Sequence, residues 1–197
     1  MSKFADTVHG IFHNERLRKV LLSYRMLLIP AALAVVLYFS DFKYFWYAFG
    51  VSLFGELIQL WCFASLDKQS ELAYNGLYKY TRNPMYLGRF FIVLGFFLLL
   101  GNPYVIVPLT IIYYLYMWHR VQREEVKLIK IFGQPYEDYC KRVNRFFPSL
   151  RGMPGGSIKI WKWKLFNQNH GWINLVGMLV LYAAAYLWFF LRDRFGV

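Results

Sequence analysis

Residues 82–118 read RNPMYLGRFFIVLGFFLLLGNPYVIVPLTIIYYLYMW, two apolar runs separated by the turn Gly101-Asn102-Pro103. The runs are Met85–Leu100 and Tyr104–Trp118, and each has the composition of a short hydrophobic helix. A connection this short makes the two helices antiparallel neighbours, so the second returns the chain to the side from which the first left. The polar segments on either side of this helical hairpin are therefore predicted to meet.

Both polar segments carry a dense pattern of functional residue types. The segment before the hairpin contains Gly76-Leu77-Tyr78 and Arg82-Asn83-Pro84-Met85-Tyr86-Leu87-Gly88. The segment after it contains, in order, Glu124-Glu125, Leu128, Phe132-Gly133, Tyr136, Tyr139 and Arg145-Phe146-Phe147-Pro148. If the hairpin lies in a bilayer, these groups converge where membrane meets water, a position suited to an amphiphilic ligand.

Composition favours a membrane protein. Apolar residues make up 58% of the 197 residues and charged residues only 17%, fewer than a soluble domain usually has. The five apolar stretches are Leu21–Phe39, Tyr44–Ala64, Met85–Leu100, Tyr104–Trp118 and Ile173–Leu191. A transmembrane helix needs roughly 20 such residues, and the two hairpin stretches fall slightly short. We expect an all-α integral membrane protein with about five transmembrane helices, or four if the hairpin is partly re-entrant.

The distribution of basic residues predicts the orientation. In this topology all but three of the 23 Lys and Arg residues lie on one side, the exceptions being Lys43, Arg192 and Arg194. The positive-inside rule then makes the N-terminus and both polar segments cytoplasmic. Contact with anionic lipid explains the net charge of +12, so no nucleic-acid partner is expected. Nothing in the sequence indicates an oligomeric state.

The first polar segment is suited to start a helix. Pro84 has no N–H and fits the first helical turn, with Asn83 as the N-cap residue. The exposed N–H groups of such a turn attract anions. Gly88 and Gly95 narrow one face of the helix for a close neighbour, either a helix or a ligand.

Glu124 and Glu125 are adjacent, so on a helix they point about 100° apart. One of them can pair with Arg120 four residues earlier, and the other can face the mouth of the hairpin. A carboxylate at that mouth suits a ligand with an amine, a sulfonium or ribose hydroxyls. The alternative is a solvated amphipathic helix from Trp118 to Phe132, ended by Gly133.

Together, the two segments resemble the isoprenylcysteine carboxyl methyltransferase family, to which phospholipid N-methyltransferases are related. The shared order is G-x-Y, R-[HN]-P-x-Y-x-G, a hairpin, E-E-x-x-L-x-x-x-F-G-x-x-Y-x-x-Y and R-F-x-P, within Gly76–Leu150. The resemblance implies a cytosolic pocket for S-adenosylmethionine and a lipid or lipid-modified acceptor that reaches it from the membrane. It also implies a methyltransferase core at residues 76–150. An interfacial helix and two transmembrane helices would precede it at 1–75, and an interfacial segment and a last transmembrane helix would follow at 151–197.

The resemblance assigns cofactor binding to Tyr78, Arg82, Asn83, Pro84, Met85, Tyr86, Gly88, Glu124, Glu125, Tyr136 and Tyr139. It assigns catalysis to Arg145, which would orient a carboxylate or phosphate, and to Glu125. Two positions depart from the family pattern. Asn83 stands where the family more often has His, and it cannot act as a base. Asn144 stands where Pro commonly precedes the Arg.

Glu56 lies in the middle of the second apolar stretch, with Gln59 almost one turn further on. A charge at this depth is costly and usually faces a cavity or a partner. We assign Glu56, Gln59 and Arg89 to the acceptor site, with a Glu56–Arg89 pair or a helix–helix hydrogen bond as alternatives. No metal is expected, because His9 and His13 have no third ligand nearby and neither Cys62 nor Cys140 belongs to a C-x-x-C motif.

Two other functional classes remain open at this stage. Sterol-type reductases have a similar hairpin with a related motif and use a nicotinamide cofactor, but they are longer. The other class is a non-enzymatic membrane scaffold.

The charge distribution yields a topology prediction. Lys79 and Lys141 are expected on the cytoplasmic side and Lys43 on the opposite side. Single cysteines at these three positions, in a chain without Cys62 and Cys140, can be labelled in intact cells with a membrane-impermeant reagent. Labelling at position 141 from outside would contradict the orientation.

Overall fold

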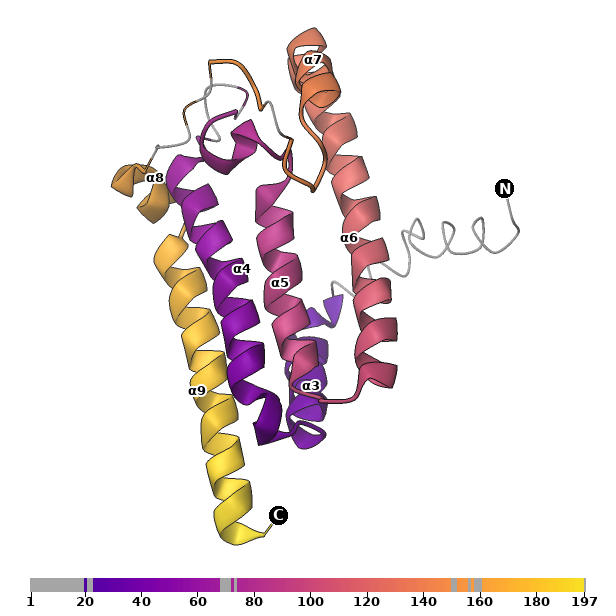
Figure 1. The fold of residues 1–197 in the computed structure, drawn as a ribbon, viewed down its shortest axis with the longest axis vertical. Coiled ribbons are helices and arrows are strands. Elements are labelled where there is room, and N and C mark those ends of the chain that lie inside the picture. The colour runs from indigo at the N-terminus through magenta and orange to yellow at the C-terminus, as the bar shows by residue number, and fades with distance from the viewer. Residues whose placement is uncertain are drawn as a thin grey trace, which may run out of the picture.

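The structure is a computed structural model that describes residues 20, 23–67, 72, 74–149, 152–155, 157 and 161–196. Every regular element in these ranges is helical, as the sequence predicted (Figure 1). The expected N-terminal interfacial helix, His9 and His13, and residues 158–160 of the expected C-terminal interfacial segment lie outside the described residues.

Five long helices account for the five apolar stretches: α3 (Arg25–Tyr38), α4 (Phe45–Ser65), α5 (Pro84–Leu98), α6 (Pro103–Phe132) and α9 (Gly171–Phe195). The shorter elements are η1 (Phe42–Tyr44), η2 (Gly76–Lys79), α7 (Gln134–Arg142) and α8 (Trp163–Gln168). In Figure 1 the long helices run along one common direction, and α7, α8 and the start of α5 lie toward the same end. The α5–α6 turn lies at the other end, so α5 and α6 form the predicted hairpin.

The helix boundaries follow from local sequence. Pro84 occupies the first turn of α5, and Asn102 caps α6 by accepting a hydrogen bond from the Tyr104 amide (3.0 Å). Gly133 ends α6 with φ of 58°, a conformation that favours glycine. The helix predicted from Trp118 to Phe132 is therefore confirmed, as the second half of a continuous 30-residue helix.

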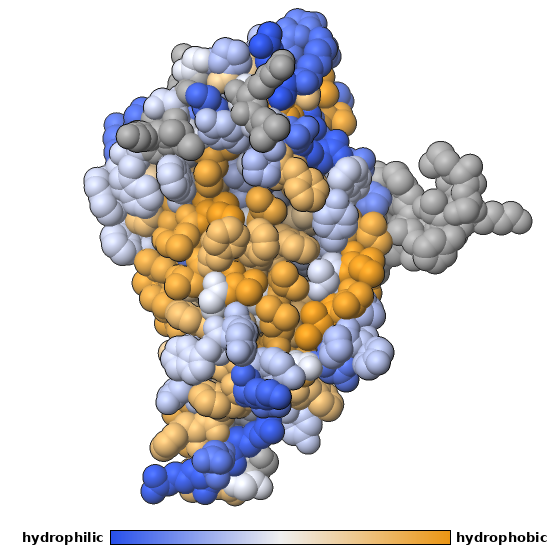
Figure 2. Space-filling view, viewed as in Figure 1, coloured by the Kyte–Doolittle hydropathy of each residue, from blue (hydrophilic) through white to orange (hydrophobic). Residues whose placement is uncertain are grey.

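Two described segments are long and apolar enough to cross a membrane, Phe42–Ser65 and Gly171–Phe195. Pro84–Leu98 is apolar but shorter. Figure 2 shows a broad apolar band over the middle of the molecule with hydrophilic side chains toward both ends, and exposed residues such as Leu57, Ile112 and Val180 are apolar. This surface is what a bilayer-spanning bundle presents, whereas the predicted total of five spans goes beyond these two segments.

Helices α4 and α5 touch along their backbones. A Cβ atom built on Gly55 would lie 2.5 Å from the Gly88 carbonyl oxygen, and one built on Gly88 would lie 2.7 Å from the Gly55 oxygen. Small residues at such a crossing allow the close approach that membrane helices use instead of hydrophobic burial. The neighbour expected on the Gly88 face is therefore helix α4.

A polar junction joins α9 to the same pair of helices. The hydroxyl of Tyr182 on α9 donates to the Ala48 carbonyl oxygen (2.9 Å) and lies 2.7 Å from the Ser52 hydroxyl on α4. Ser52 in turn donates to the Ile92 carbonyl oxygen on α5 (2.9 Å). These bonds fix α4, α5 and α9 relative to one another within an apolar surrounding.

We predict that Gly55→Ala destabilises the protein by about 1–3 kcal/mol, because the new methyl group overlaps backbone atoms of α5. Thermal unfolding in detergent, followed by tryptophan fluorescence, measures the loss. Gly50→Ala on the same helix is the matched control, because no atom lies within 4 Å of its added Cβ. Equal unfolding temperatures for both variants would contradict the close crossing.

Candidate functional site

The two polar segments meet at the end of the hairpin, as predicted. Thr81 and Asn144 form a parallel bridge. The Arg82 amide donates to the Asn144 oxygen (2.9 Å), and the Asn83 amide donates to the Arg145 oxygen (3.2 Å). These backbone contacts place side chains from the start of α5 next to side chains that follow α7.

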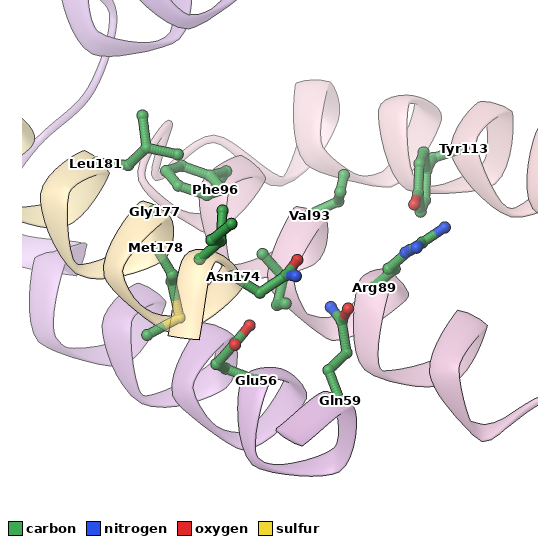
Figure 3. A pocket seen from close by; sticks show the side chains of 12 residues that line it. Glu56, Gln59, Arg89, Val93, Phe96, Tyr113, Asn174, Gly177, Met178 and Leu181 are labelled. Carbon is green, nitrogen blue, oxygen red and sulfur yellow. The ribbon is translucent and has the colours of Figure 1, made fainter. Parts of the chain in front are cut away.

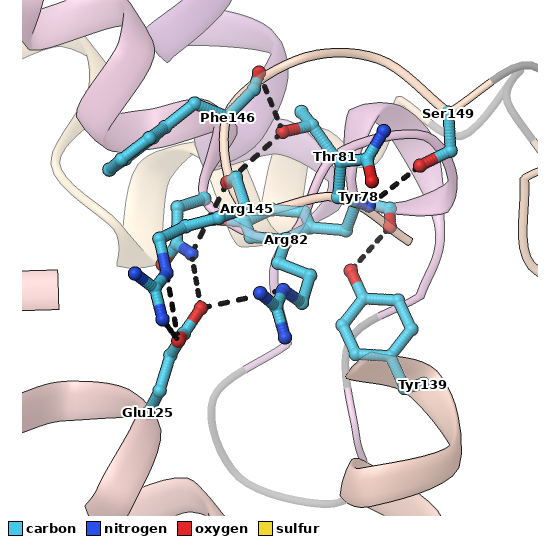
Figure 4. Close-up of polar contacts among 10 residues, drawn as sticks. Tyr78, Thr81, Arg82, Glu125, Tyr139, Arg145, Phe146 and Ser149 are labelled. Atoms are coloured by element: carbon cyan, nitrogen blue, oxygen red, sulfur yellow. Dashed lines mark hydrogen bonds and ion pairs between the residues drawn. The ribbon is translucent and has the colours of Figure 1, made fainter. Parts of the chain in front are cut away.

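Glu125 is the centre of this junction (Figure 4). Its Oε2 accepts hydrogen bonds from Arg145 Nε (3.0 Å) and Nη2 (2.7 Å). Its Oε1 accepts from Asn83 Nδ2 (3.0 Å) and lies 3.4 Å from Arg82 Nε. The residue is only 6% exposed, so a single buried carboxylate connects both motifs through two guanidinium groups and an amide.

Arg145 is held from a second side by an aromatic ring. Its guanidinium carbon lies 4.5 Å from the centre of the Trp118 ring, within the range of a cation–π contact. Sequence reasoning missed Trp118, because its place at the end of an apolar run looks like an ordinary interface tryptophan. The two contacts leave the Arg145 guanidinium with a defined orientation.

Glu124 differs sharply from its neighbour, because its side chain is exposed. It accepts a short hydrogen bond from the Tyr86 hydroxyl, and that hydroxyl accepts one from Arg120 Nε (3.1 Å). The expected direct pair between Arg120 and a glutamate is therefore wrong, because the Tyr86 hydroxyl lies between Arg120 and Glu124. Of the acidic pair, Glu124 is the carboxylate that is exposed to solvent.

Tyr136 and Tyr139 of α7 are 2% and 1% exposed and pack with Val143. The Tyr139 hydroxyl donates to the Tyr78 carbonyl oxygen (2.5 Å), which attaches α7 to η2. Burial raises the pKa values of Tyr78 and Tyr139 above their already high ordinary value. These three predicted cofactor residues lie within the packing that supports the site.

Asn83 occupies the N-cap position of α5, but its side chain does not cap the helix. The predicted N-cap position is confirmed, and the side-chain amide donates to Glu125 instead of bonding to the helix. Asn144 is the second position that departs from the family pattern. Its backbone N–H donates to the Ser149 hydroxyl (2.6 Å), a bond that proline cannot make. Thr81, which the motif reading missed, donates from its hydroxyl to the Phe146 carbonyl oxygen (3.0 Å).

Three further predicted cofactor residues belong to the first turns of α5. Pro84 is buried, Met85 packs against the cluster around Phe63, and Gly88 contacts the α4 backbone. They support the start of the helix. On the outer side of α6, Glu125 and Arg145 form part of the wall of a hollow of about 650 Å³, which Lys127 and Lys130 also line.

The predicted acceptor residues share a second cavity, of about 360 Å³, between α4, α5, α6 and α9. Figure 3 shows Glu56 and Gln59 projecting from α4 toward α9 and α5, with Arg89 on the far side of Gln59. The contacts of Arg89 are with Met85 Sδ (3.9 Å) and the Tyr86 ring (5.6 Å). The alternative of a Glu56–Arg89 ion pair is therefore wrong for the described residues, and both side chains line the cavity.

In comparisons with known proteins, the chain is similar to methyltransferases. The family model described as phospholipid methyltransferase matches residues 26–135, more than half of the chain. The protein-S-isoprenylcysteine O-methyltransferase of Xenopus laevis is 34% identical over 82 residues, and that of Schizosaccharomyces pombe is 34% identical over 84. A probable protein-S-isoprenylcysteine O-methyltransferase of Oryza sativa subsp. indica is 26% identical over 134 residues. No solved structure matches.

These matches differ in how much of each protein they cover. They span 42% of this chain but 28% of the Xenopus protein, and 43% of this chain but 36% of the S. pombe protein. The rice match spans 60% of this chain and 70% of that protein. The chain thus spans only about a third of the length of the first two relatives.

We predict that Glu125→Gln destabilises the protein by about 3 kcal/mol, because it leaves Arg82 and Arg145 without their shared negative charge. Glu124→Gln is the matched control and should cost about 1 kcal/mol or less, since its side chain is exposed. Thermal unfolding in detergent compares the two. Equal losses would contradict a structural role specific to Glu125.

Proposed function

Because the chain belongs to the phospholipid methyltransferase family, we propose that it transfers a methyl group from S-adenosylmethionine to a lipid or lipid-modified acceptor. The observation that carries the proposal is the junction at Glu125, which joins the two motifs on which the resemblance to the methyltransferase family rests. The names of the relatives support methyl transfer, and the apolar helices support an acceptor that resides in a membrane.

The residues of the junction fit a ligand with an amino-acid end. S-adenosylmethionine carries a carboxylate, an ammonium group and a sulfonium whose methyl group is already activated. Glu124 is exposed and suits the ammonium group or the ribose hydroxyls. Arg82 and Arg145 supply two positive charges against the single charge of Glu125, so the junction retains an excess charge that attracts a carboxylate.

The remaining predicted cofactor residues act through the scaffold in this proposal. Tyr86 orients Glu124, Asn83 orients Glu125, and Tyr139 holds α7 against η2. Orienting Glu125 requires only a hydrogen-bond donor, which Asn83 supplies as well as the His that the family more often has at this position. Methyl transfer depends mainly on alignment, which a half-buried side chain held from two sides, such as Arg145, can support.

The acceptor cavity is the 360 Å³ space between α4, α5, α6 and α9. Most of its lining is apolar, including Val93, Phe96 and Leu181, which suits the chain of a lipid. Arg89 is the cation in this lining that would orient an anionic part of the acceptor. The proposal places the N-terminus and both motifs on the cytoplasmic side, with α3 and the hairpin completing five spans around the core at residues 76–150.

S-adenosylhomocysteine should stabilise the detergent-solubilised protein against heat, whereas NADPH should not. Incubation with radiolabelled S-adenosylmethionine and a lipid extract should give a labelled lipid product. Glu124→Gln should weaken S-adenosylhomocysteine binding by about tenfold, because it removes one charge-assisted hydrogen bond. Stabilisation by NADPH alone would favour a sterol-type reductase, and stabilisation by neither nucleotide would favour a scaffold.

A further inference from the structure

The hollow on the outer side of α6, of about 650 Å³, carries an excess of positive charge. Its cationic side chains are Arg123, Lys127, Lys130 and Arg145. The acidic residue in the lining is Glu125, whose carboxylate is already bonded to Arg145 and Asn83. Lys127 and Lys130 have no ion-pair partner among the described residues. The charges of these two lysines are therefore available to an anionic ligand.

Three of these cations recur along one face of α6. Arg123, Lys127 and Lys130 are four and three residues apart, so their side chains project from the helix in one general direction. Two apolar residues of the same lining, Val126 and Ile129, are 53% and 37% exposed. The hollow thus offers positive charges next to apolar side chains, and an anionic amphiphile is the kind of ligand that complements both.

The position of the hollow along α6 matches the layer of lipid headgroups. Helix α6 begins at Pro103, beside the hairpin turn, and at 1.5 Å per residue it reaches Arg123 after about 30 Å and Lys130 after about 40 Å. The hydrocarbon core of a bilayer is about 30 Å thick, and about 40–45 Å with its headgroups. If the hairpin turn lies at one boundary of this core, the basic side chains lie among the headgroups at the other. Figure 2 shows hydrophilic side chains over this end of α6, beyond the apolar band.

We propose that this hollow binds the phosphate of an anionic phospholipid, with Lys127 and Lys130 as its principal cations. Lysine ammonium groups form charge-assisted hydrogen bonds with phosphate oxygens, and Val126 and Ile129 contact the glycerol and the first carbons of the acyl chains. Arg145 also lines the hollow, so a bound headgroup lies beside the Glu125 junction. The general attraction of a basic face to an anionic membrane is spread over many residues, whereas this site depends on two lysines.

The test compares lipids that differ only in the headgroup. Delipidated full-length protein in a non-ionic detergent is titrated with phosphatidylglycerol or with phosphatidylcholine of the same acyl chains, and bound lipid is counted by native mass spectrometry. Phosphatidylglycerol should bind more tightly. The double variant Lys127→Gln with Lys130→Gln should weaken phosphatidylglycerol binding at least about tenfold, because each basic side chain beside an anionic headgroup contributes about fivefold in affinity.

The matched control is Lys162→Gln with Lys164→Gln, which removes two exposed lysines at α8, toward the same end of the molecule. This variant should retain the wild-type affinity for phosphatidylglycerol, and thermal unfolding followed by tryptophan fluorescence verifies that each variant is folded. Equal affinities of the wild-type protein for the two lipids would overturn the site. An equal loss in the control would also overturn it, since diffuse attraction would then explain the binding. Displacement of phosphatidylglycerol by an equal concentration of inorganic phosphate would exclude a lipid as the specific occupant.

Discussion

The rest of the site depends on the contact between the Glu125 carboxylate and its three partners. Residues on opposite sides of the hairpin in sequence, Asn83 and Arg145, reach the same buried carboxylate. Without a shared negative charge, Arg82 and Arg145 would repel each other at the point where the two segments pair. The Glu125 carboxylate offsets this repulsion, so the backbone bridge between Thr81 and Asn144 can form. The bridge in turn fixes the start of α5.

Much of the hairpin was predictable because its signals are local. Pro84 lies in the first turn of α5, Pro103 lies in the first turn of α6, and Gly133 ends α6. Each of these residues acts on the backbone next to it in sequence. The meeting of the two motifs followed from the same connectivity. The division between Glu124 and Glu125 also followed, because helix geometry separates adjacent side chains whatever surrounds them.

The contacts that sequence reasoning missed join residues far apart in the chain. Nothing near Trp118 indicates that Arg145 will stack on it, and nothing near Tyr182 indicates that it will bond to Ala48. The side chain of Asn83 illustrates the same limit. A local rule makes it a helix cap, but a carboxylate 42 residues later offers a stronger, charge-assisted hydrogen bond.

The two buried glutamates Glu125 and Glu56 differ in whether their carboxylate oxygens are hydrogen-bonded. Both carboxylate oxygens of Glu125 accept hydrogen bonds from the two motifs, whereas the Oε1 atom of Glu56 has no hydrogen-bond partner among the described residues. Helix α5 connects the two sites, since Asn83 begins it and Arg89 lies six residues later, about 9 Å along the axis. The Gly55–Gly88 crossing holds α5 against α4, which carries Glu56. The distance between the proposed donor site and the proposed acceptor cavity is thereby set by one pair of closely packed helices, and methyl transfer would depend on such alignment.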